Sequence, residues 1–151
     1  MKIEKKSAHF NIHFSRREAM ILRHVLSLYP LLNPDYHRLS QKPDPRIGPG
    51  QKMLEDAMSE QHRRIKSEIS AMMEPLQEKH PGQISLRLDG GQLERFLRAL
   101  NDVRVGSWVR LGKPDIENRA ALQMDENNAP FFQVMEVSGY FEMEILEALR
   151  R

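Results

Sequence analysis

The sequence predicts an α+β, predominantly α-helical protein: a helical bundle of four to five helices with a small two-stranded β-sheet. Several long segments carry apolar residues three and four positions apart, which is typical of amphipathic helices. Two short segments instead alternate apolar and polar residues, which is typical of half-buried strands. A length of 151 residues suits one hydrophobic core. We therefore expect a single domain over residues 1–151.

The first element should be a strand over residues 8–15. Phe10, Ile12 and Phe14 alternate there with polar residues, so one face of the strand is apolar. The same alternation returns in residues 83–89. Because an isolated strand is not stable by itself, we expect these two segments to pair with each other.

A helix should follow over residues 16–29. Ser15 and Glu18 have the spacing of a capping box, in which the serine side chain accepts from a first-turn amide and the glutamate reaches back to the serine backbone. The apolar residues that follow have helical spacing as far as Tyr29, and Pro30 ends the helix.

The middle of the chain should hold a long connection and the longest helix. Residues 30–50 contain five of the nine prolines, and a connection of this length either carries a function or has no fixed structure of its own. A helix is expected over residues 51–79, because its apolar residues lie three, four and seven positions apart.

Three helices are expected after the second strand. Asp89 is placed to cap a helix over residues 91–112, which ends at a glycine. A short helix should occupy residues 116–124. The final helix should cover residues 130–150, with a proline at its first position.

Composition excludes several classes of function. The chain has no cysteine, which excludes a disulfide scaffold, a thiolate zinc site and a cysteine nucleophile. No zincin, nucleophile-elbow, dinucleotide or phosphate-loop motif is present. We expect no cofactor, no metal and no catalytic residue, although an enzyme is not excluded. Without a signal peptide or a membrane-spanning stretch, the expected location is cytoplasmic, away from the membrane.

Charge is distributed unequally along the chain. Residues 1–66 carry 13 lysines and arginines against 7 acidic residues, whereas residues 67–151 carry 10 against 14. The basic half allows a weak nucleic-acid contact, but the overall net charge of +2 makes nucleic acid an unfavoured partner. The basic residues of that alternative are Lys2, Lys5, Lys6, Arg16, Arg17, Arg63 and Arg64.

Two charged residues fall inside apolar stripes when the helices are projected at about 100° per residue. Arg104 lies within the stripe of helix 91–112, and Glu142 lies within the stripe of helix 130–150. Each charge needs a partner, so we expect a partly buried ion pair between them. The pair either fixes the register of two helices or belongs to an anionic-ligand site in which Asn101, Arg104 and Trp108 line a pocket and Glu142 is the counter-charge.

The final helix is apolar on nearly every side. Besides its core stripe, it carries Phe132, Val137, Tyr140 and Met143 on other faces. A helix of this kind is either central in the bundle or shared with another molecule. We therefore expect these four residues to form an interface in a homo-oligomer or with another protein.

From Gln83 onward the chain resembles an uncharacterised bacterial family, the domain of unknown function numbered two-thousand-and-seventeen. The resemblance rests on Ile-Ser-Leu-Arg-Leu at residues 84–88, on residues 96–104, on Arg-Leu-Gly at residues 110–112 and on a terminal amphipathic helix. Val105 to Trp108 stand where the family has a leucine-rich step. Genes of this family often lie beside the gene of the adaptor that delivers substrates to the Clp protease, which implies a bacterial regulatory or adaptor role.

Together these observations favour a non-catalytic protein–protein interaction or regulatory module, with a link to regulated proteolysis implied by the resemblance. One alternative is a binder of a small anionic ligand, or an enzyme, that uses Arg104, Asn101 and Trp108. The other is a nucleic-acid binder that uses the basic N-terminal half.

Overall fold

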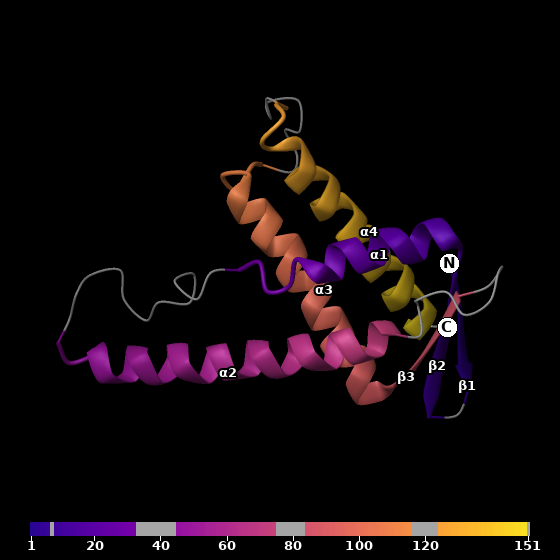
Figure 1. Cartoon of the computed structure of the whole chain (residues 1–151), viewed down its shortest axis with the longest axis horizontal. Helices are drawn as coiled ribbons and strands as arrows, with labels where there is room; N and C mark the ends of the chain where they lie inside the picture. The colour runs from indigo at the N-terminus through magenta and orange to yellow at the C-terminus, as the bar shows by residue number, and fades with distance from the viewer. Residues whose placement is uncertain (7, 33–44, 75–83, 116–123, 151) are drawn as a thin grey trace.

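The computed structural model describes residues 1–6, 8–32, 45–74, 84–115 and 124–150. Within these ranges the chain forms three strands and four helices (Figure 1). In chain order they are β1 (Lys2–Lys6), β2 (His9–Phe14), α1 (Arg16–Ser27), α2 (Gly48–Met73), β3 (Ile84–Asp89), α3 (Gly90–Arg110) and α4 (Ala129–Arg150). The α+β, mostly helical class predicted from the sequence is confirmed.

The sheet is antiparallel, with the strand order β1-β2-β3. The predicted pairing of the two alternating segments is confirmed, and Ile12 lies opposite Leu86. The prediction of only two strands is wrong, because β1 forms a third strand against β2. Ile3 is the one apolar residue of β1, so this edge strand shows no alternation of apolar and polar residues. Backbone pairing to β2 forms it without that pattern.

The boundaries of the helices mostly follow the predicted signals. The Ser15 backbone amide donates to Glu18 Oε2 at 2.8 Å and the Glu18 amide donates to Ser15 Oγ at 3.3 Å, so the capping box is confirmed. Helix α1 ends at Ser27, two residues before the predicted end. Helix α2 begins at Gly48, not at residue 51, because Pro49 is tolerated in the first turn of a helix.

The other predicted ends agree to within two residues or lie outside the described residues. Helix α3 covers Gly90–Arg110 against the predicted 91–112, and α4 starts one residue before the predicted 130. Most of the predicted connection 30–50, the predicted end of the long helix beyond residue 74, and all but the last residue of the predicted short helix 116–124 lie outside the described residues.

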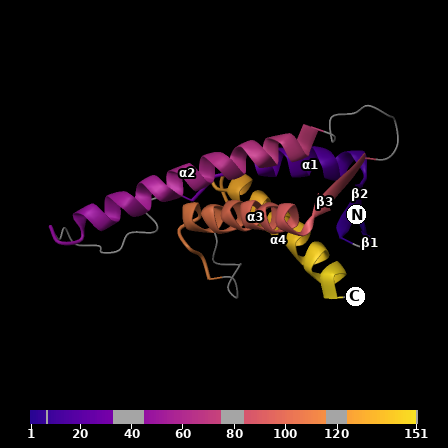
Figure 2. The same ribbon diagram turned by 90° about the horizontal axis from the view of Figure 1, so that it is seen from below.

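The core lies between the sheet and the helices that cover it. The largest fully buried side chains come from β2, β3 and helices α1, α3 and α4, and include Ile12, Leu22, Leu86, Leu88, Phe96, Leu100, Phe141 and Ile145. Helix α2 buries only residues from its C-terminal half, namely Ile65, Ile69, Met72 and Met73. Its N-terminal half extends beyond the other elements (Figure 2).

Helix α3 holds the segment that follows α1. The backbone amides of Leu31 and Leu32 donate to Asp102 Oδ1 at 2.7 and 3.3 Å. A Cβ atom on Gly106 would lie 2.8 Å from Leu31 Cβ, so only a glycine leaves room for this segment. These contacts tie α1 to the middle of α3, the helix that also carries the candidate site.

Candidate functional site

The predicted ion pair between α3 and α4 is confirmed. Arg104 Nε lies 2.8 Å from Glu142 Oε2, and Arg104 Nη2 donates to Asn101 Oδ1 at 2.8 Å. The contact between Arg104 Nε and the Glu142 carboxylate is an ion pair that joins the two helices. The Glu142 side chain is 13% exposed and the Arg104 side chain is 39% exposed. The carboxylate is thus the more deeply buried of the two groups.

Burial raises the pKa of Glu142 more than the nearby Arg104 lowers it, so the pKa lies above its ordinary value. The cation therefore offsets only part of the cost of removing the carboxylate from water. This balance favours the interpretation that the pair fixes how α3 and α4 pack against each other, with little net gain in the free energy of unfolding.

A groove of about 580 Å³ lies between α3 and α4 beside this pair. Its lining residues are Arg104, Val105, Trp108, Met135, Glu136, Gly139, Tyr140 and Met143. The Arg104 side chain passes over Gly139, where an added Cβ would lie 3.6 Å from Arg104 Cδ. Trp108 Nε1 donates to the carbonyl of Pro114 at 3.0 Å, which holds the indole in place and satisfies its only donor.

The four residues predicted to bind a ligand occupy different positions. Arg104 and Trp108 line the groove. Asn101 is exposed and touches the site only through its hydrogen bond with Arg104. Glu142 pairs with Arg104 and is not a lining residue. Because Glu142 already balances the charge of Arg104, the arrangement is a mostly apolar groove with one neutralised cation.

The four residues predicted to form an interface are also divided. Tyr140 and Met143 line the groove and are 41% and 49% exposed. Phe132 is half-buried on the same helix. Val137 is partly buried and packs against the core, so it does not belong to the outward surface.

Sequence reasoning missed Gly139 and the exposed Leu146 on the outward face of α4. A signal was present, because Phe132, Gly139, Met143 and Leu146 are seven, four and three positions apart. This spacing forms a second stripe opposite the core stripe of the helix. The stripe is hard to recognise in the sequence because glycine has no apolar side chain to mark its position.

Other kinds of site find no support in the part of the chain that the structure describes. Its His, Asp and Glu residues form no group of three or more that could hold a metal ion. None of the helices among these residues is long and apolar enough to cross a membrane.

Comparison of the chain with protein-family models, with curated proteins and with solved structures gives no match. The resemblance of the segment from Gln83 onward to the uncharacterised bacterial family therefore stays a prediction.

Proposed function

We propose that this chain is a non-catalytic protein-binding module whose α3–α4 groove receives an amphipathic helix of a partner protein. The observation that carries the proposal is the exposure of Tyr140 and Met143, which share an open groove with Trp108. Aromatic and methionine side chains gathered on a solvent-facing surface are typical of protein interfaces.

A helix suits this surface because of the spacing along α4. Gly139, Met143 and Leu146 lie four and three positions apart, so they follow one another along a single face over two turns. A partner helix contacts such a face with residues at the same intervals, as helices packed in apolar grooves do. At Gly139 the partner helix would meet the aliphatic part of the Arg104 side chain, which passes over the glycine.

The charges around the groove favour a basic partner helix. Glu136 lines the groove, and Glu147 follows Met143 one turn further along α4. Arg104 is already paired with Glu142. Lysine or arginine side chains at the edges of the bound helix would complement the surface.

The same charges disfavour a second copy of this chain as the occupant. An antiparallel pair of α4 helices centred between Gly139 and Met143 would bring Glu136 of one copy beside Glu147 of the other. Like charges placed together at an interface cost free energy. The role expected from the bacterial family, regulation or adaptor action linked to proteolysis, is compatible with a module that holds a helix of another protein.

The single tryptophan makes the proposal directly testable, since Trp108 lies in the groove. We would titrate the full chain with a synthetic amphipathic helix that carries leucines three and four positions apart and lysines at its edges. A matched peptide has glutamates in place of the lysines. We expect the basic peptide to shift the Trp108 emission and the acidic peptide to bind at least tenfold more weakly.

Two variants locate the binding surface. Met143→Glu should weaken binding of the basic peptide at least tenfold, because it places a charge where the apolar face must dock. Met53→Glu is the matched control, because Met53 is 74% exposed on the projecting half of α2. Equal binding of the two peptides, or equal effects of the two variants, would contradict the proposal. A concentration-dependent dimer that Met143→Glu abolishes would instead make a second copy the occupant.

A further inference from the structure

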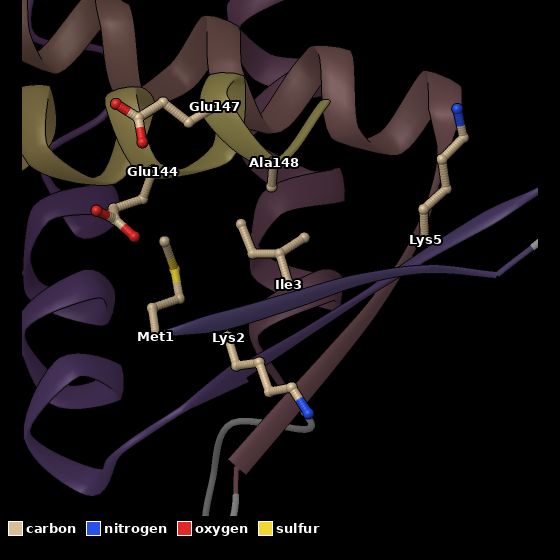
Figure 3. Close-up of a pocket in the computed structure, with 7 residues that line it drawn as sticks. All are labelled: Met1, Lys2, Ile3, Lys5, Glu144, Glu147 and Ala148. Carbon is tan, nitrogen blue, oxygen red and sulfur yellow. The ribbon is translucent and has the colours of Figure 1, made fainter. Parts of the chain in front are cut away.

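A second groove, of about 760 Å³, lies between strand β1 and the C-terminal half of α4 (Figure 3). Its lining residues are Met1, Lys2, Ile3, Lys5, Glu144, Glu147 and Ala148. None of them lines the α3–α4 groove, although Glu147 also lies one turn beyond Met143 at the edge of that groove. One wall of this groove is a strand and the other is a helix.

The strand wall has backbone groups available for pairing. Within the described residues, β1 pairs only with β2 and lies at the edge of the sheet. Alternate residues of an edge strand point their amide and carbonyl groups away from the sheet. A further strand could therefore add to β1 along the floor of the groove.

The side chains along the groove change character from one end to the other. Figure 3 shows Glu144 near Met1 at one end, Ile3 facing Ala148 in the middle, and Lys5 at the far end. Successive residues of a strand rise by about 3.3 Å, so Met1 and Lys5 are separated by roughly 13 Å. The Met1 ammonium group at one end is paired with Glu18 Oε1 at 2.7 Å, so Glu144 and Glu147 make that end acidic. The groove thus has an acidic end, an apolar centre and a basic end.

The basic end is distinct from the charges on the opposite face of the strand. Lys2 and Lys6 both contact Glu4, at 2.8 and 3.5 Å. Lys5 lies on the other face, in the same row as Phe10, and its Nζ is 5.9 Å from the centre of that ring. A carboxylate brought into the groove at this end would meet Lys5.

We propose that this groove binds an extended segment of a partner protein, which adds to β1 as an antiparallel fourth strand. In such an antiparallel pairing, the residues of the added strand that lie opposite Lys5, Ile3 and Met1 are on the face directed into the groove. The segment therefore carries an acidic residue opposite Lys5, an apolar residue opposite Ile3 and a basic residue opposite Met1, near Glu144 and Glu147. Read from its N-terminus, its pattern is acidic-x-apolar-x-basic.

A second copy of β1 fits this edge poorly. The strand carries three lysines and one glutamate, so two copies side by side would bring two positively charged strands together. Lysines on an edge strand are a common means of preventing such self-pairing. A segment with an acidic residue opposite Lys5 meets no such charge repulsion.

The test uses the full chain and two ten-residue peptides of equal composition. One has Glu-Thr-Val-Thr-Lys at its centre, and the other has the reversed order Lys-Thr-Val-Thr-Glu. We expect the first peptide to bind at least tenfold more tightly, to slow amide hydrogen exchange in the Lys2–Lys6 segment and to leave the Trp108 emission unchanged. The last readout separates this groove from the α3–α4 groove.

A charge-swapped chain provides the decisive comparison. The triple variant Lys5→Glu, Glu144→Lys and Glu147→Lys exchanges the two charged ends, and circular dichroism verifies that it folds. It should prefer the reversed peptide by a similar factor. Methylation of the peptide amides that face β1 should abolish binding, because the added strand then loses its backbone hydrogen bonds.

Four results would overturn the proposal. The first is the absence of binding by either peptide at millimolar concentration, and the second is equal binding of both. The third is an unchanged preference in the folded triple variant. Self-association of the unliganded chain with slowed exchange in Lys2–Lys6 would also overturn it, because a second copy would then occupy the edge.

Discussion

Arg104 and Glu142 form an unequal pair across the contact between α3 and α4. Their closest atoms are 2.8 Å apart, but the carboxylate is 13% exposed and the arginine side chain is three times as exposed at 39%. If the pair is broken, Arg104 can turn towards water while Glu142 stays enclosed. The free energy of unfolding should therefore change by different amounts when Arg104 or Glu142 is substituted.

We expect Arg104→Met to lower the free energy of unfolding by about 2 kcal/mol, because it leaves an enclosed carboxylate without a cation. Glu142→Gln should change it by less than about 1 kcal/mol, because it removes the group that is costly to bury. Urea unfolding of both variants measures the difference. Equal losses would show that the pair contributes symmetrically.

The effect of Arg104→Met should depend on pH. Burial already raises the pKa of Glu142 above 4.5, and without Arg104 nothing on α3 opposes that shift. A raised carboxyl pKa contributes stability at low pH that is lost as the pH rises through the folded-state pKa. The variant should therefore be destabilised less at pH 4 than at pH 8, relative to the unaltered chain at each pH. Adding Glu142→Gln should remove this pH dependence.

Gly106→Ala should destabilise the fold by about 1–3 kcal/mol, because the new Cβ would lie 2.8 and 2.9 Å from atoms of Leu31. Gly90→Ala is the matched control in the same helix, since no atom lies within 4 Å of its new Cβ. The control should be neutral or stabilising, because alanine favours helix. Thermal unfolding that shifts equally in both variants would contradict the close approach of Leu31 to α3.

Asp102→Ala should cost about 1–3 kcal/mol of unfolding free energy, because the backbone amides of Leu31 and Leu32 then lose their acceptor. Asp102→Asn should cost less, since an amide oxygen can still accept. Hydrogen exchange at these two amides provides a local readout and should accelerate most in the alanine variant. Unchanged exchange would show that other contacts hold this segment.

Met143→Glu should leave the free energy of unfolding within about 0.5 kcal/mol of the original value, because the side chain is half exposed and outside the core. The variant would then separate binding from folding in the peptide titration. A large loss of stability would mean that Met143 supports the fold. It would then no longer be assigned to a binding surface.

Much of the local structure was predictable because its signals lie close together in the chain. Ser15 and Glu18 marked a helix start, and alternating residues marked β2 and β3. The pair of Arg104 with Glu142 was also predictable, since a charge inside an apolar stripe demands an opposite charge. Strand β1 was not predictable, because most of its residues are charged and exposed, so its sequence shows no alternation of apolar and polar residues.

The amino-acid pattern by itself determined the helical class, the capped starts of α1 and α3, the pairing of β2 with β3 and the need for one interhelical ion pair. Only the tertiary structure decided where the two grooves lie. Each groove joins residues distant in sequence, such as Trp108 with Met143, and Ile3 with Ala148. Periodicity shows which side of an element is apolar, but exposure depends on which neighbour covers that side. That neighbour is set by the packing of the whole chain.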